Sequence, residues 1–451
     1  MTTVTAAIAA AAIPDDGLSF FSLVSILITL AAVSSYINYR YIKLPTTIGV
    51  MLVALIVSLA LIIAGPYAEG FRERAASTVA QMQFSDALLH GMLAFLLFAG
   101  SIHVDLEDLG REWLTVSLLA ILGTLVSTVI VGGLTWFILG WLGLEIPILH
   151  AMLFGILISP TDPIAVMGIM KSVGAPRQLE VQIAGESLFN DGLGVVVFLL
   201  LLDLSGWAEF DKSSVASDAD FWQSIHVGQI LLLLLKEVGG ALALGLSAGF
   251  ATYYMLKRVD NYQVEVLLTL ALAMGIYALT DAMHLSAPIA VVVAGLFVGN
   301  QGRALAMTEK TREHVDTFWE LIDEILNAVL FLLIGLEILV LPLERQLLIA
   351  GSLAIPIVLF ARWLSVTGII GSLTWVSVQS KGAISVLTWG GLRGGISVAM
   401  ALSLPANDSR SLLLTLTYFV VVFSILVQGL TIGRVIRRTT APSSAGTQCV
   451  Q

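Results

Sequence analysis

The stretch GILISPTDPIAVMGIM, residues 155–170, is apolar enough to cross a membrane as a helix, but it is interrupted at its centre. Pro160 and Pro163 flank Thr161 and Asp162 there. Proline lacks a backbone N–H and clashes with the preceding helical turn, so a regular helix does not continue through this point. An aspartate directly before a proline also has the form of a helix cap followed by the first helical residue. The stretch therefore predicts two half-helices that meet inside a membrane.

A second interrupted stretch, VLTWGGLRGGISVAMALSLP at residues 386–405, lies in the later half of the chain and carries two glycine pairs around Arg393. Backbone groups freed at such breaks are tolerated only beside protein or a water-filled cavity. Interrupted segments at corresponding places in two halves are typical of inverted-repeat transporters. A proline kink and a glycine-rich packing face would explain each stretch alone, but not an acid in one and a base in the other.

The composition supports an all-α polytopic membrane protein. The chain has 451 residues, of which 57% are hydrophobic and 12% are charged, whereas soluble domains carry about 25% charged residues. The length of its apolar runs is close to the roughly 20 residues that a helix needs to span a bilayer. Apolar and polar residues do not alternate along these runs, as they do along β-barrel strands. We predict about 13 transmembrane helices, the fifth and twelfth of them discontinuous, centred near residues 28, 56, 94, 125, 158, 191, 241, 270, 292, 327, 362, 393 and 422.

The distribution of charge predicts orientation and domain limits. If the N-terminus lies outside, most of the 22 Lys and Arg residues fall in cytoplasmic loops, so the C-terminus is predicted to be cytoplasmic. We expect an extracytoplasmic segment at residues 1–17, a transmembrane domain at 18–436 and a short cytoplasmic tail at 437–451. The net charge of -10 argues against nucleic acid as a partner.

Two acids lie in the predicted sixth helix, within the stretch ESLFND at residues 186–191. Acids inside a membrane are costly and are functional candidates by default. At about 3.6 residues per turn, Ser187 and Asp191 share one helix face, while Glu186 and Asn190 share another. The two acids are therefore predicted to have different roles.

Ser187 and Asp191, together with Thr161 and Asp162 from the first break, offer only oxygen ligands. Oxygen ligands suit a small hard cation, and the six histidines and one cysteine show no zinc-like spacing. Glu186 is instead expected to pair with Arg362 of the predicted eleventh helix, because a buried ion pair that loses one member leaves a costly lone charge.

Four motifs together resemble the monovalent cation/proton antiporters, specifically the sodium/proton exchanger branch with Asn and Asp at its ion site. They are SPTDP, GESLFNDG, NAVLFLLIGLE and WGGLRGGISVAMALSLP, and the resemblance covers nearly all of residues 18–436. It implies a core domain that carries the crossed, broken helices and moves against a dimer-forming interface domain. The protein is then expected to be a homodimer in a prokaryotic inner membrane, with no cofactor besides the transported ions. It places the ion and proton site on Asp191, Asn190, Ser187, Thr161 and Asp162. It also implies a structural charge pair of Glu186 and Arg362, and compensation of a helix break by Arg393, the twelfth-helix arginine.

One departure from the family concerns the third predicted helix. Many members carry Glu there in a pattern like Phe-Glu-Gly, but this chain reads LLFAGSIHVDL with Ala99 at that position. An accessory carboxylate on the ion path is therefore missing, which bears on the choice of cation.

The expected function is secondary active antiport of Na⁺ for H⁺ by competition at Asp191, electroneutral and with alternating access. A K⁺/H⁺ antiporter is the alternative. A remote alternative is an intramembrane aspartyl protease that uses Asp162 and Asp191. The stretch FNDGLG does not match the glycine-rich signature of those enzymes. A cation channel is also remote, because no repeated filter segment is visible. We therefore do not expect an enzyme.

Overall fold

The computed structural model describes residues 20–64, 91–207, 227–303, 306–341, 344–375, 378–405 and 408–440. The described residues form helices and no strands. The predicted segment at 1–17 and most of the predicted tail at 437–451 lie outside the described residues, and the predicted domain limits stay predictions.

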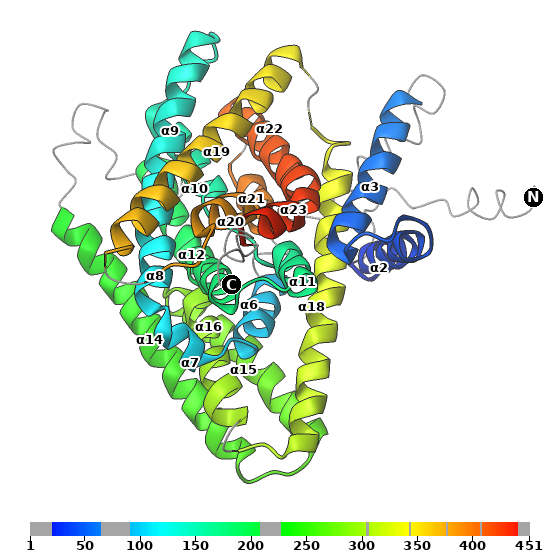
Figure 1. Ribbon diagram of the computed structural model, residues 1–451, viewed down its shortest axis with the longest axis vertical. Coiled ribbons are helices and arrows are strands. Elements are labelled where there is room, and N and C mark those ends of the chain that lie inside the picture. The colour runs from blue at the N-terminus through cyan, green and yellow to red at the C-terminus, as the bar shows by residue number, and fades with distance from the viewer. Residues whose placement is uncertain are drawn as a thin grey trace, which may run out of the picture. The chain divides into compact units, whose positions relative to one another are not determined.

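Figure 1 shows the helices along the chain. Their bounds are α2 (Phe20–Ile37), η1 (Asn38–Ile42), α3 (Thr46–Ile63), α6 (Leu93–Ile102), α7 (Leu106–Arg111), α8 (Trp113–Leu118), η4 (Leu119–Gly123), α9 (Thr124–Trp141), α10 (Ile148–Ile158), α11 (Ile164–Val173), α12 (Arg177–Leu204), α14 (Val227–Leu256), α15 (Tyr262–Ala282), α16 (Ala287–Phe297), η5 (Val298–Gly302), α18 (Glu309–Glu337), α19 (Arg345–Leu373), α20 (Ala383–Gly390), α21 (Gly395–Leu402), α22 (Asp408–Phe423), η6 (Ser424–Gln428) and α23 (Gly429–Thr440). The η segments are short π-helical turns.

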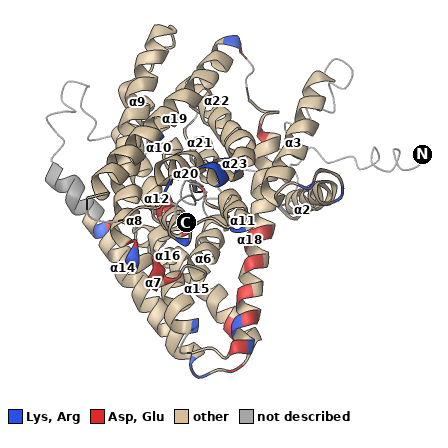
Figure 2. Cartoon of the chain, viewed as in Figure 1, with Lys and Arg blue, Asp and Glu red and all other residues tan. Residues whose placement is uncertain are grey.

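The helices confirm the all-α membrane class. Among the described residues, 8 helices are long and apolar enough to cross a bilayer, and shorter apolar helices accompany them at Leu93–Ile102, Ile148–Ile158, Ile164–Val173 and Ala287–Gly302. Charged residues are sparse along most helices and gather on the first half of α18 (Figure 2). The number of 13 membrane crossings stays a prediction.

One compact unit contains α2, α3 and residues 327–341, which include the end of α18. Its core is small, formed by Ala31, Val50, Ala54, Ala328, Leu332 and Leu336. The Ser58 hydroxyl donates to the Gly335 carbonyl at 3.0 Å. A side chain at Gly335 would lie 2.8 Å from the Met51 carbonyl oxygen, so glycine allows these helices to pack closely.

The second unit spans residues 88–326 and 342–451 and contains both interrupted stretches. One apolar cluster of this unit packs α6, α14, α15 and α16 together around Phe98, Val291 and Trp319. Ala99, which replaces the acid expected from the family, is 1% exposed in this cluster. Its position therefore belongs to the apolar core of this unit.

The structure confirms that both interrupted stretches are discontinuous helices. α10 ends at Ile158 and α11 begins at Ile164, which leaves residues 159–163 non-helical. α20 ends at Gly390 and α21 begins at Gly395. α10 contacts α21, and α12 contacts all four half-helices, so the two breaks and the helix that carries both acids share one region of this unit (Figure 1).

Candidate ion-binding site

The two breaks are joined through the backbone. The Asp162 N–H donates to the Leu392 carbonyl at 2.7 Å. A side chain at Gly394 would overlap Asp162, coming within 2.5 Å of its Cβ and 2.7 Å of its Cγ. Glycine at the second break therefore allows the two unwound segments to touch.

Asp162 caps the half-helix that follows it. Its Oδ1 accepts a hydrogen bond from the Ile164 N–H at 2.9 Å, the position that the Asp-Pro pattern predicts. Because Asp162 also lies against Gly394, its carboxylate faces the N-terminal ends of both α11 and α21. Helix N-termini stabilise negative charge, so the second carboxylate oxygen remains available without leaving the charge unsupported.

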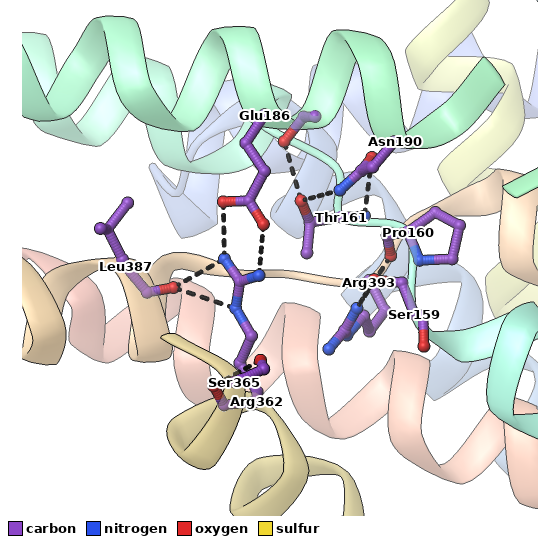
Figure 3. Close-up of polar contacts among 10 residues, drawn as sticks. Ser159, Pro160, Thr161, Glu186, Asn190, Arg362, Ser365, Leu387 and Arg393 are labelled. Atoms are coloured by element: carbon purple, nitrogen blue, oxygen red, sulfur yellow. Dashed lines mark hydrogen bonds and ion pairs between the residues drawn. The ribbon is translucent and has the colours of Figure 1, made fainter. Parts of the chain in front are cut away.

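Arg393 binds the carbonyl groups at the other side of the first break, where α10 ends. It is 2% exposed, and its Nη1 donates to the Ser159 carbonyl and, at 3.1 Å, to the Pro160 carbonyl (Figure 3). These carbonyls lie just beyond the C-terminal end of α10, where the helix dipole is negative and carbonyl groups lack helical partners. The family resemblance implies that Arg393 compensates for a helix break, and its described side-chain hydrogen bonds are to these carbonyls.

Asn190 of α12 forms hydrogen bonds with Thr161 in the non-helical stretch between α10 and α11. Its Nδ2 donates to the Thr161 hydroxyl at 3.0 Å, and its Oδ1 accepts from the Thr161 N–H at 3.4 Å (Figure 3). The Thr161 and Ser187 hydroxyl oxygens are 2.9 Å apart. All three side chains are buried. Since the Thr161 oxygen accepts from Asn190, its own proton is free to go to Ser187.

Asp191 lies one turn beyond Ser187 on the same helix face and is partly exposed. Among the described residues its carboxyl group has no hydrogen bond or ion pair, and it is close enough to Asp162 for the two acids to interact electrostatically. Gly194 lies on the same stretch of α12, where a side chain would meet Pro160, so α12 approaches the break closely. This acid is available to a cation or a proton.

Glu186 lies in a different environment. Its Oε2 accepts from Arg362 Nη2 at 2.8 Å, its Oε1 accepts from Nη1, and the carboxyl group is 1% exposed (Figure 3). Arg362 also donates to the Leu387 carbonyl, at 3.0 Å from Nη2 and 3.3 Å from Nε. The arginine therefore links α12, α19 and α20.

Sequence reasoning missed several groups that hold the crossing. The Arg393 N–H donates to the Ser424 hydroxyl at 3.0 Å, and Ser424 lies in a π-helical turn. Gly391 gives space to Arg362, since a side chain there would lie 2.7 Å from Arg362 Nε. The glycine pairs beside Arg393 were the available signal for the second contact, whereas no pattern in the sequence indicated Ser424.

Two crossed half-helix breaks, with an unpaired carboxyl group beside them, define a class of protein: a secondary transporter of small ions. The family model described as "Sodium/hydrogen exchanger, transmembrane" matches residues 24–438. The chain belongs to this family, whose members are transporters rather than enzymes.

Relatives and a solved structure agree with this assignment. The chain is 45% identical over 427 residues to the Na⁺/H⁺ antiporter NhaP of Pseudomonas aeruginosa, covering 93% of this chain and 97% of that one. It is 34% identical over 437 residues to the Na⁺/H⁺ antiporter NhaH of Halobacillus aidingensis, covering 94% and 98%. The sodium proton antiporter MjNhaP1 of Methanocaldococcus jannaschii has the same fold, with a TM-score of 0.74 at 19% identity over 94% of this chain and all of that one.

Proposed function

We propose that this protein exchanges Na⁺ for H⁺ across the membrane, one for one, at Asp191. The observation that carries the proposal is the unpaired Asp191 carboxyl group beside the crossing of two broken helices. The relatives named as Na⁺/H⁺ antiporters support it.

In this mechanism Asp191 binds either one cation or one proton. In both states the carboxylate charge is compensated, so the site can cross the hydrophobic barrier. When the site is empty and ionised, moving it across the barrier has a high free-energy cost. Competition for one carboxylate is sufficient to couple the two fluxes. We assign the other cation ligands to Asp162 and to the hydroxyl oxygens of Thr161 and Ser187, since oxygen ligands suit Na⁺.

Asn190 has a positioning role in this proposal. Its amide donates to the Thr161 hydroxyl and accepts from the Thr161 N–H, so it holds the unwound backbone against α12. The Thr161 oxygen is thereby kept next to Ser187. Because an amide does not titrate, Asn190 adds no second exchangeable proton.

Glu186, Arg362 and Arg393 support the site without binding the ion. The Glu186 and Arg362 pair is buried and joins three helices, and Arg393 stabilises the carbonyl end of α10. Their charges are engaged by each other or by backbone groups, so none is available to a transported ion in this conformation.

We further propose that the protein works as a homodimer in a bacterial inner membrane, with its N-terminus outside and its C-terminus in the cytoplasm. The bias of basic residues between loops supports the orientation, and the relative in Pseudomonas aeruginosa supports the location. Cross-linking of the purified protein in lipid measures the oligomeric state, and labelling of cysteines introduced near either end measures the orientation.

The test of function is proton movement in proteoliposomes. Vesicles with an imposed pH gradient receive Na⁺, K⁺ or Li⁺ as chloride salts at matched concentration, with empty vesicles as the control. We expect Na⁺ to dissipate the gradient in a saturable manner, and K⁺ to do so weakly. A dominant response to K⁺ would identify the K⁺/H⁺ alternative. Cation flux that ignores the proton gradient would identify a channel.

A further inference from the structure

Ser424 contacts the second break although it belongs to a different helical segment. It is the first residue of the π-helical turn η6 and is 0% exposed. Its hydroxyl oxygen accepts a hydrogen bond from the Arg393 N–H at 3.0 Å. Gln428, the last residue of the same turn, is 3% exposed and donates from Nε2 to the Trp389 carbonyl at 3.1 Å. This turn therefore binds both the last turn of α20 and the linker that follows it.

The bond to Ser424 and the bond that joins the two breaks use one peptide unit. The Leu392 carbonyl accepts from the Asp162 N–H at 2.7 Å. The Arg393 N–H is the other end of the same unit, and this peptide bond is trans. In a planar trans peptide the carbonyl and the N–H point in opposite directions. The Asp162 N–H, the peptide unit and the Ser424 hydroxyl are therefore connected in series, and such hydrogen bonds strengthen one another.

The backbone around this peptide unit restrains it little. Glycine pairs stand on both sides of Leu392 and Arg393, at residues 390–391 and 394–395. Glycine restricts backbone rotation less than any other residue. Arg393 also lines a small cavity that has room for about one water molecule. The direction of the Leu392 carbonyl therefore depends strongly on the hydrogen bonds at the two ends of the unit.

The direction of this carbonyl affects the position of Asp162, which is held at two points. Its N–H is bound to the Leu392 carbonyl, and its Oδ1 accepts from the Ile164 N–H at 2.9 Å. The first bond holds the residue against the second break, and the second bond orients the carboxyl group. A shift of the Leu392 carbonyl therefore changes the position of Asp162 relative to Asp191, the proposed carrier.

We infer that Ser424 is a positioning residue for ion binding. Its hydroxyl orients the peptide unit between Leu392 and Arg393, and this unit places Asp162, a proposed ligand of Na⁺. Ser424 acts through the peptide unit and is not itself a ligand. The inference rests on the proposed function, because it takes Asp162 as an ion ligand. A serine that only joined two helices would affect stability without changing the affinity for Na⁺.

The experiment measures the rate of proton movement in proteoliposomes at a series of Na⁺ concentrations. Ser424→Ala removes the hydroxyl and leaves the side chain nearly the same size. We expect the Na⁺ concentration for half-maximal rate to rise about threefold to tenfold, the effect of losing one hydrogen bond, while the maximal rate changes less than about twofold.

The matched control is Thr417→Val. It removes a buried hydroxyl of α22 that donates to the Leu413 carbonyl of its own helix at 2.8 Å. This variant should keep the half-maximal Na⁺ concentration of the parent protein. An unchanged value in Ser424→Ala, or an equal rise in both variants, would overturn the inference while the proposed function stands.

Hydrogen–deuterium exchange tests the structural step without transport. Pro160 and Pro163 have no backbone N–H, so few exchanging groups accompany Asp162 in a short peptide. We expect exchange at Asp162 to be about threefold to tenfold faster in Ser424→Ala than in the parent, and unchanged in the control. Equal exchange in all three proteins would overturn the inference. Faster exchange in Ser424→Ala, together with a parent protein that does not respond to Na⁺, would contradict the proposed function and support the role of Ser424 in placing Asp162.

Discussion

Glu186 and Asp191 are acids of one helix, yet their surroundings differ. Glu186 is buried against Arg362, which contacts both of its oxygens. Asp191 is partly exposed, and its charged neighbour is another acid, Asp162. The helix turns the two side chains to different faces, one toward a fixed base and one toward a break in the backbone. Position on the helix face, rather than residue type, separates a structural acid from a candidate carrier.

The largest effect is expected from Asp191→Asn. The amide keeps the shape of the side chain but neither ionises nor exchanges a proton, so Na⁺-driven proton movement should fall to the level of empty vesicles. The readout is the initial rate of gradient dissipation in proteoliposomes. Size-exclusion and thermal profiles like those of the parent protein provide the control for folding. Robust antiport by the folded Asp191→Asn protein would show that Asp191 is not the carrier of the ion and the proton.

Glu186→Gln should act mainly on stability. The change strands the Arg362 charge, with an expected loss on the order of 3 kcal/mol for a fully buried pair. The double variant with Arg362→Gln should recover part of this loss, measured by denaturant or thermal unfolding in detergent. If the double variant is as unstable as the sum of the single variants, the two residues are not energetically coupled.

Gly394→Ala tests the contact that brings the second break to Asp162. The new methyl group would overlap the Asp162 side chain, so the breaks must separate slightly, with an expected destabilisation of about 1–3 kcal/mol and slower antiport. The matched control is Gly368→Ala, because a side chain at this helical glycine of α19 meets nothing within 4 Å. Equal behaviour of the two alanine variants would show that the close approach is unimportant.

The smallest expected effect is that of membrane potential. If Asp191 exchanges one proton for one Na⁺, no net charge moves and the potential does no work on the cycle. We expect Asp162 to stay ionised because it caps α11 and faces the start of α21. Proteoliposomes clamped at either polarity with a potassium ionophore should show the same rate and endpoint. Moving one net charge across the membrane changes the free energy by about 2.3 kcal/mol per 100 mV. A rate or endpoint that follows the potential would therefore indicate that a second proton is transported, with Asp162 as the candidate carrier.

The sequence was sufficient to predict the breaks, because proline and glycine act on their own backbone. It also predicted which acids share a helix face, since that follows from helical periodicity. It did not predict the partners of Arg393, which are the backbone carbonyls of Ser159 and Pro160. Nor did it indicate Ser424, whose hydroxyl accepts a hydrogen bond from the Arg393 N–H although the two residues are 31 positions apart. Contacts to backbone groups and burial between distant segments have no local pattern. The assigned roles of the site residues stay predictions.

The hydrogen bond between the Asp162 N–H and the Leu392 carbonyl uses backbone atoms alone. Every residue except proline supplies that N–H, and every residue supplies that carbonyl. Substitution at Thr161 or at the carboxyl group of Asp162 can therefore alter the ligands offered to the ion while this bond persists. The contact that holds the two breaks together therefore does not depend on the side chains proposed to bind the ion. Single substitutions among those side chains can change the preferred ion while the crossing of the two breaks is kept.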